Sequence, residues 1–308
     1  MIERITIASD ELVVEIAPLG AALASVRPVE HGAPGPNLVL APGPAGDGAY
    51  RGVIAGRFAN RIGRARFELD GSTVMLDAND GVHCLHGGPE GFGARRWKLI
   101  DGRDDWVSLA LHSPAGDQGF PGAVDATATY RVRAACIEVE LAATSDAPTV
   151  VSLTNHAYWN LDGWDEAATI DDHELCIDAD AVVAVDADLV PTGALVGRSG
   201  AFGRIGARSL DLSWCRPDGR ARGVCAELIS PRANRSLRVR SDLPAVQVYT
   251  GDHLGAPHGP RAGLAIEAQL PPDAPNHPEW WGWAGTPIVR PGETWRHTTT
   301  FELSRTTR

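Results

Sequence analysis

Residues 124–143 read VDATATYRVRAACIEVELAA and alternate apolar with polar side chains through two runs separated by a short break. Alternation with a period of two is typical of strands that bury one face and expose the other. The runs Val124–Arg133 and Cys136–Ala143 are therefore predicted to pair as a long β-hairpin.

Further short β-branched or alternating runs, broken by Gly, Pro and Asp, lie on both sides of this hairpin, and no long window shows helical periodicity. They are Arg4–Ala8, Leu12–Ala17, Ala65–Leu69, Ser72–Leu76, Val107–Leu111, Thr149–Asn155, Glu174–Ile177, Val182–Val185, Ala226–Ser230, Leu237–Ser241, Ala245–Thr250, Leu264–Gln269 and Thr294–Leu303. Asp70-Gly71 is a strong hairpin turn signal, and the runs between 226 and 250 are expected to form a meander.

Many short strands at this spacing, connected through 34 Gly and 22 Pro, predict an all-β sandwich or barrel. No shift in composition, linker or internal repeat divides the chain. We therefore expect residues 1–308 to form a single domain.

The composition narrows the possible partners and compartment. A formal net charge of −11 argues against a nucleic-acid or anionic-membrane partner, because both require a basic surface. No stretch approaches the roughly 18 apolar residues of a membrane span, and the N-terminus lacks the features of a signal peptide. The five scattered cysteines then read as free thiols, which predicts a cytoplasmic protein.

The segment Val151–Gly163, VSLTNHAYWNLDG, begins as an apolar run typical of a buried strand. It ends with His156 between Asn155 and the rings of Tyr158 and Trp159. A histidine in an apolar context is often structural, but here it is also suited to proton transfer beside a polyol.

Two earlier segments carry further polar groups. GRFANRIG at residues 56–63 offers arginines and an Asn, and Arg presents a rigid fork of donors suited to hydroxyls or carboxylates. HCLHGG at residues 83–88 suggests a metal site, but no second Cys/His pair completes a four-ligand set. We expect no metal, and expect Gly87-Gly88 to leave His86 free to donate to a hydroxyl.

Near the C-terminus, Glu267 lies within the apolar run Leu264–Gln269. A carboxylate is rarely buried without a purpose, although an edge strand could turn it to solvent. The following PPDAPNHP predicts a rigid loop beside the carboxylate.

Taken together and in this order, seven segments resemble blocks of the aldose 1-epimerase (galactose mutarotase) family. They are GRFANRIGRARFELDG, HCLHGGPEGFGARRW, DQGFPGAVDATATY, LTNHAYWNLDG, VPTG at Val190–Gly193, AVQVYTGD and IEAQLPPDAPNHP. The resemblance implies a large, twisted antiparallel β-sandwich with an open sugar cleft and no metal or organic cofactor. It also implies an isomerase that interconverts the α and β anomers of a free hexose or pentose. We expect a monosaccharide partner and a monomer or homodimer.

The resemblance assigns roles residue by residue. His156 is similar to the family's general acid and Glu267 to its general base, and the sugar-contacting residues are matched by Asn60, Arg61, His86 and Gln247. The family also carries an Asp-His-Asn-Phe-like block, for which Asp211 is the best match. At the next three positions this chain has Leu212, Ser213 and Trp214.

Three alternatives remain open from the sequence. Arg57, Arg61, Arg95 and Arg96 could hold a phosphorylated or otherwise anionic sugar. The chain could also be a non-catalytic sugar-binding protein. Finally, Asp211 and Glu267 could act as a carboxylate pair in glycoside hydrolysis.

Overall fold

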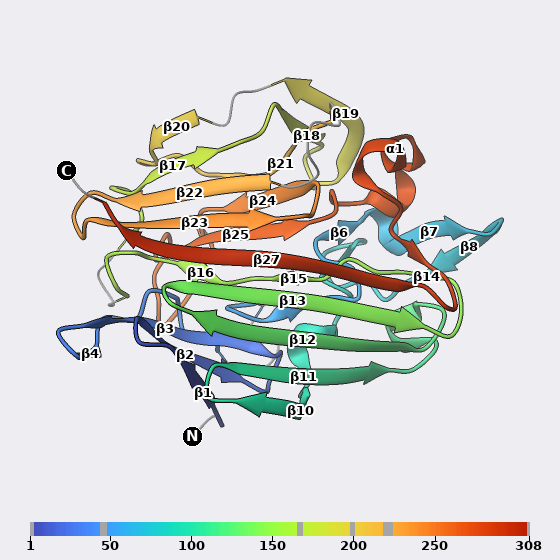
Figure 1. The fold of residues 1–308 in the computed structure, drawn as a ribbon. Helices are drawn as coiled ribbons and strands as arrows, with labels where there is room; N and C mark the ends of the chain where they lie inside the picture. The colour runs from blue at the N-terminus through green and yellow to red at the C-terminus, as the bar shows by residue number, and fades with distance from the viewer. Residues whose placement is uncertain (1–2, 44–47, 165–168, 198–200, 218–223, 307–308) are drawn as a thin grey trace.

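The computed structural model describes residues 3–43, 48–164, 169–197, 201–217 and 224–306. Its largest element is a nine-stranded antiparallel sheet, whose strands run side by side across Figure 1. In spatial order these are β10 (Lys98–Arg103), β11 (Trp106–Ser113), β12 (Val124–Arg133), β13 (Cys136–Ser145), β27 (Thr294–Arg305), β23 (Arg235–Ser241), β22 (Val224–Ser230), β17 (Glu174–Ile177) and β20 (Ala201–Arg204).

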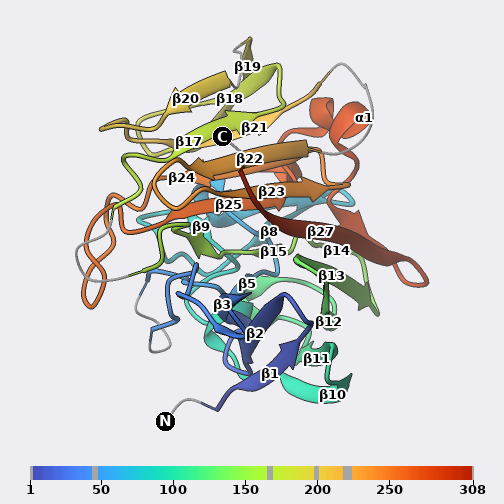
Figure 2. The same ribbon diagram turned by 60° about the vertical axis from the view of Figure 1, so that its left-hand side comes forward.

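A second antiparallel sheet of six strands packs against it and gives the fold its sandwich form (Figure 2). Its order is β16 (Tyr158–Trp159), β25 (Leu264–Gln269), β24 (Ala245–Tyr249), β21 (Asp211–Cys215), β18 (Ala181–Val185) and β19 (Pro191–Gly197). The expected all-β sandwich is confirmed.

Smaller sheets complete the molecule. They are β1 (Ile5–Ala8), β2 (Leu12–Ala17), β3 (Ala22–Glu30) and β4 (Ala33–Pro34) in one sheet, and the pairs β5 (Ile54–Ala55) with β15 (Thr154–Asn155), β6 (Arg61–Ile62) with β9 (Cys84–Leu85), β7 (Arg66–Leu69) with β8 (Ser72–Met75), and β14 (Thr149–Val150) with β26 (Ile288–Val289). The described helices are short: α1 (Trp281–Ala284) and the 3-10 turns Gly63–Ala65, Phe92–Ala94, Asp117–Gly119, Ala274–Asn276 and Pro278–Trp280. None of the helices in the described part of the chain is long and apolar enough to cross a membrane.

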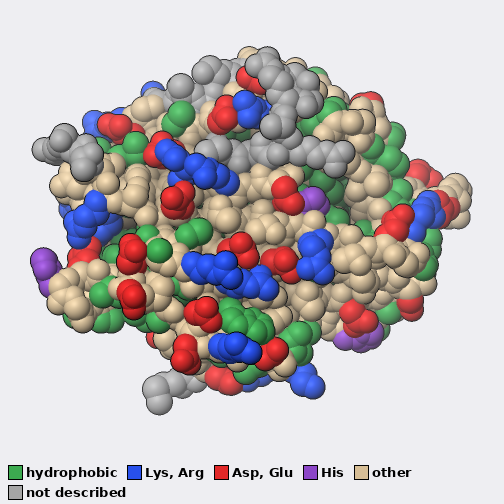
Figure 3. Space-filling model, viewed as in Figure 1, with side chains coloured by type: hydrophobic (Ala, Val, Ile, Leu, Met, Phe, Trp, Pro, Cys, Tyr) green, Lys and Arg blue, Asp and Glu red, His purple; other side chains and the backbone are tan. Residues whose placement is uncertain are grey.

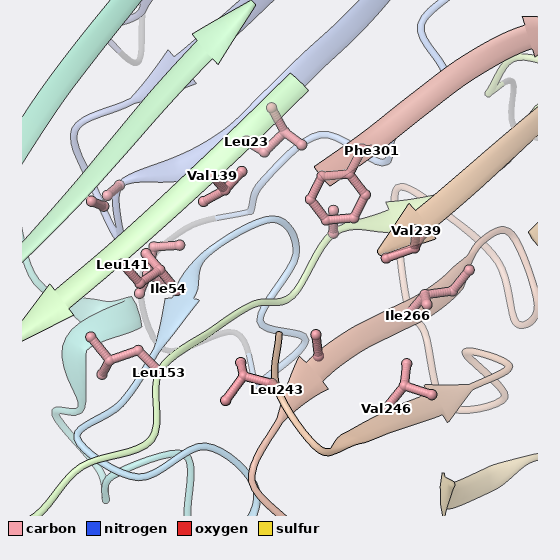
Figure 4. Close-up of a cluster of buried hydrophobic side chains, with 14 of the residues drawn as sticks. Leu23, Ile54, Val139, Leu141, Leu153, Val239, Leu243, Val246, Ile266 and Phe301 are labelled. Carbon is pink, nitrogen blue, oxygen red and sulfur yellow. The ribbon is translucent and has the colours of Figure 1, made fainter. Parts of the chain in front are cut away.

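The long hairpin forms as its alternation predicts. β12 and β13 pair without a register shift from Val124–Ser145 to Arg133–Cys136. Their apolar side chains enter a core shared by both sheets, in which Val139 and Phe301 of the large sheet belong to one cluster with Val246 and Ile266 of the smaller sheet (Figure 4). Burial of each such side chain contributes roughly 1.5–3 kcal/mol.

The opposite face of the large sheet meets solvent. Acidic and basic side chains are interspersed there, as Figure 3 shows. Several pair across neighbouring strands, including Arg131 with Glu138 and Arg296 with Glu140. This alternation of a dry and a charged face is what a half-buried antiparallel sheet requires.

Two expectations about strands are wrong. Thr149–Asn155 is not one strand: β14 and β15 are separate two-residue pieces, and Ser152 between them makes only an isolated bridge to Phe58. The segment is apolar because it passes between layers and meets a different partner every few residues. Nor does Ala245–Thr250 continue a meander, because β24 pairs with β21 and β25 in the other sheet.

Candidate active site

The site lies on the face of the six-stranded sheet that points away from the core. Val246 and Ile266 fill the core, so their neighbours Gln247 and Glu267 face the other way. Gln247 pairs with Ser213 on one side and with Glu267 on the other.

Extending the register of β16 and β25 by two residues places His156 opposite Glu267. Since directly paired residues share a face, four side chains form one line across the sheet, which we call the polar row: Ser213, Gln247, Glu267 and His156.

His156 and Glu267 form the centre of the site. His156 Nε2 lies 3.5 Å from Glu267 Oε1, and the side chains are only 5% and 2% exposed. Backbone hydrogen bonds from His156 N to Val53 O (2.9 Å) and from Gly52 N to His156 O (2.8 Å) hold the backbone of the histidine in place between β15 and β16. The spacing suits two groups that exchange protons with one small substrate.

Burial shifts both groups away from their charged forms. It lowers the pKa of His156 to about 4. Burial, and then the nearby charge of Asp211, raise the pKa of Glu267 well above its ordinary value. A proton shared by this pair therefore resides on the carboxyl.

The second wall of the site is built by β6 and β9, which bring Asn60 next to His86. Asn60 N donates to His86 Nδ1 (3.2 Å), and His86 N donates to Asn60 O (3.1 Å). A Cβ at Gly87 would lie 2.0 Å from Gly56 O, so only glycine permits this close approach.

This contact decides what His86 can do. Burial, the neighbouring His156 and Arg61 lower the pKa of His86 well below its ordinary value, so the ring is neutral. Because Nδ1 accepts a hydrogen bond, the ring proton resides on Nε2. His86 is thus a donor to an oxygen in the site, as the Gly87-Gly88 pair suggested.

Arg61 is held from two sides. Its Nε donates to Asp80 Oδ2 at 2.7 Å, and its carbonyl oxygen accepts from Asp273 N at 2.8 Å. Asp273 belongs to the Pro-rich loop after β25 and also accepts from Gly63 N (2.9 Å). The predicted rigid loop therefore ties the arginine segment to the strand that carries Glu267.

Asp211 completes the set. Gln247 Nε2 donates to Asp211 Oδ1 at 2.5 Å. Burial raises the pKa of Asp211, while the positive charge of Arg61 and the bond from Gln247 oppose that shift. The structure thus brings all seven predicted site residues together: Asn60, Arg61, His86, His156, Asp211, Gln247 and Glu267.

The suggested metal set of His83, Cys84 and His86 does not assemble. His83 Nδ1 accepts from Arg64 N (3.0 Å), and burial raises the pKa of the Cys84 thiol to about 12, which disfavours a thiolate ligand. Within the described ranges, the group with ligand atoms close enough for a metal is His86, His156 and Glu267, all within 4.8 Å. Metal binding there would require His86 to give up its Nε2 proton and the bond from Asn60.

The arginines proposed for an anionic sugar all bind protein groups, and Arg61 alone among them is also a predicted sugar-contacting residue, through its remaining guanidinium nitrogens. Arg57 is 2% exposed and donates to the carbonyl oxygens of residues 113, 114, 121 and 122. Arg95 pairs with Asp117 and Arg96 with Glu3, as Arg61 does with Asp80. The anionic-sugar alternative is therefore not favoured.

Three residues outside the seven predicted ones also line or support the site. The Tyr50 ring lies 4.5 Å from the His86 ring, centroid to centroid, and Tyr158 lies 5.0 Å from His156. Tyr50 and His86 border a cavity of about 240 Å³ beside the site. Tyr158 stood in the quoted motif, but nothing in the sequence pointed to Tyr50 or to the third, Asp80.

Comparisons with known proteins agree with this geometry. The aldose 1-epimerase family model matches residues 3–302. The aldose 1-epimerase of Escherichia coli is 35% identical over 95% of this chain and 92% of its own, and the galactose mutarotase of Bos taurus is 31% identical over 98% and 94%. An aldose epimerase homologue from C. elegans has a similar structure, with a TM-score of 0.89, 28% identity and 99% of each chain covered. The chain belongs to the aldose 1-epimerase family.

Proposed function

We propose that this enzyme interconverts the α and β anomers of a free hexose or pentose, with Glu267 as the base and His156 as the acid. The observation that carries the proposal is the buried pair itself, with 3.5 Å between His156 Nε2 and Glu267 Oε1. Anomer exchange needs one acid and one base on either side of C1, and each is regenerated when the ring closes.

Ring opening moves two protons. Glu267 removes the proton of the C1 hydroxyl, and the O–H electron pair forms the second C1–O1 bond. The bond between C1 and the ring oxygen breaks, its electron pair stays on the ring oxygen, and His156 protonates that oxygen. Rotation about C1–C2 and the reverse transfers close the ring on the other face.

The burial of the pair supports these roles. The reacting form is the one in which the single proton of the pair has moved from Glu267 to His156, which leaves a carboxylate base and an imidazolium acid. Ring opening then gives a protonated Glu267 and a neutral His156, which is the distribution that burial favours. The buried charge pair is thus converted into a neutral one as the aldehyde forms, and the reverse transfers restore it.

The remaining residues suit a polyhydroxyl ligand. His86 offers an Nε2–H donor, Arg61 keeps guanidinium nitrogens beyond the one bound to Asp80, and Gln247 Oε1 is an acceptor without a partner in the described protein. Together they would hold the ring so that C1 and the ring oxygen meet Glu267 and His156.

Anomer exchange measured by NMR on α-glucose, α-galactose, α-xylose and α-arabinose tests the proposal. We expect acceleration for at least one sugar, and a loss of roughly 10²–10⁴-fold in Glu267→Gln. Acceleration of none of them, or a fully active Glu267→Gln, would refute the assignment. Sugar binding without exchange would instead indicate the non-catalytic binding protein.

We also infer the compartment, the partner and the assembly of the enzyme. The four cysteines whose side chains are described are free, which supports a reducing, cytoplasmic location. The net charge of −11 supports a small sugar rather than a nucleic acid or a membrane as the partner. We also infer one domain over residues 1–308, present as a monomer or homodimer.

A further inference from the structure

Ser213 occupies the end of the polar row, next to Gln247. It lies two residues from Asp211 on β21, and alternate residues of a strand share a face. Ser213 therefore points to the same side of the sheet as Asp211, Gln247 and Glu267. On its far side, the register of β18 and β21 places the apolar Val183 opposite it, so polar contacts end at Ser213.

The Ser213 hydroxyl is buried and unused. The residue is 3% exposed, and its Oγ has no hydrogen-bond partner in the part of the chain that the structure describes. Two other buried serines have partners, since Ser145 Oγ donates to Ala147 O and Ser236 bonds Ser304. A buried hydroxyl without a partner costs stability, so a ligand that satisfies it is favoured.

A second unpartnered atom lies beside it. Gln247 donates through Nε2 to Asp211, which leaves Oε1 as a buried acceptor without a protein partner in the described residues. A sugar hydroxyl is both a donor and an acceptor. It can donate to Gln247 Oε1 while its oxygen accepts from the Ser213 hydroxyl.

We propose that Ser213 is a specificity-determining residue that binds, together with Gln247, one hydroxyl group of the aldose. This inference rests on the proposed function and names a contact within the same site. The enzyme should distinguish sugars that carry this hydroxyl, in the right orientation, from sugars that lack it.

Ser213→Ala, compared with Ser25→Ala, tests the contact. Ser25 is also a buried serine without an Oγ partner among the described residues, but it lies on β3. The same atom is removed in both variants, so any general effect of losing a buried hydroxyl is matched. We expect kcat/KM for the preferred aldose to fall roughly 3- to 10-fold in Ser213→Ala and to stay unchanged in Ser25→Ala.

A series of singly deoxygenated aldoses then identifies the hydroxyl. For one position, the deoxy sugar should react equally with wild type and Ser213→Ala. Equal rates for wild type and Ser213→Ala on the parent sugar, or the same loss on every deoxy sugar, would overturn the inference while leaving the epimerase assignment intact. If the wild-type enzyme neither exchanges nor binds an aldose by titration calorimetry, both proposals fail.

Discussion

The protonation of His156 and Glu267 is the residue-scale property that most constrains the enzyme. Burial lowers the pKa of His156 and raises the pKa of Glu267, so it favours the neutral form of each group. Catalysis nevertheless needs the pair to hold one proton, neither two nor none. The shifts therefore determine the pH range over which the pair is competent.

We expect kcat/KM to follow a bell-shaped pH profile. As pH falls through about 4, His156 becomes protonated while Glu267 keeps its proton, so the pair holds two protons. No carboxylate base remains, and the rate falls. As pH rises through the raised pKa of Glu267, the pair loses its only proton and the acid is lost. The measurement is anomer exchange by NMR from pH 3 to 10, after subtraction of the uncatalysed rate.

Asp211 offers a variant with a predicted direction. Its charge contributes to raising the pKa of Glu267, so Asp211→Asn should move the alkaline limb to lower pH. Asp188→Asn is the control, because the Asp188 side chain is 74% exposed. An alkaline limb that stays in place in Asp211→Asn, or moves equally in both variants, would contradict this account of the pair.

At the scale of elements, the turn before β9 orients Arg61. Asp80 and His83 close this turn through backbone hydrogen bonds in both directions, and the Asp80 carboxylate then receives Arg61 Nε. The turn thereby directs the remaining guanidinium nitrogens. Asp80 is a positioning residue, because it acts on the sugar only through Arg61.

Asp80→Asn should raise KM roughly two- to fivefold with little change in kcat, since a partly exposed ion pair is worth at most about 1 kcal/mol. Asp77→Asn, an exposed neighbour in the same loop, is the matched control. In an Arg61→Ala background, where there is no guanidinium to orient, the effect of Asp80→Asn should disappear. An equal KM change in that background would mean that Asp80 acts by another route.

Elements with an alternating pattern, and the apolar run Leu264–Gln269 that forms β25, were predictable from the sequence, whereas several others were not. β12, β13 and the hairpin at Asp70-Gly71 form as expected, with Asp70 and Gly71 both at positive φ. β3 was missed because its first half is buried on both faces and does not alternate. β21 was missed because its pairing with β24 is a long-range contact that only the folded sheet defines.

The candidate site was predictable only as far as its motifs extend. His156 and Glu267 stand in recognisable segments, and the fold brings them together. Tyr50 and Asp80 stand in segments with no chemical signature, and their places depend on contacts with His86 and Arg61. The Ser213 hydroxyl became informative only when the sheet register showed which side chains lie beside it.

At the scale of the whole molecule, the large sheet supports the site from behind. Phe301 on β27 is 1% exposed, and its ring lies 5.2 Å from that of Trp159 on β16. One core cluster contains buried residues of both sheets. The site strands also carry two smaller apolar clusters of their own, one around Val183 and Cys215 and one around Tyr158 and Ala265. The main cluster nevertheless joins these strands to the large sheet, which supports the inference of a single domain.

This arrangement predicts that the site and the large sheet unfold together. In urea, tryptophan fluorescence and anomer-exchange activity should be lost in one coincident transition. Phe301→Ala should lower the free energy of unfolding by about 3–5 kcal/mol and shift both midpoints equally, because it removes packing that the two sheets share. Arg131→Ala, on the solvent face of the same large sheet, is the control and should change stability by less than about 1 kcal/mol. If Phe301→Ala moved the fluorescence midpoint and left the activity midpoint in place, the two sheets would be separate units and the single-domain inference would be wrong.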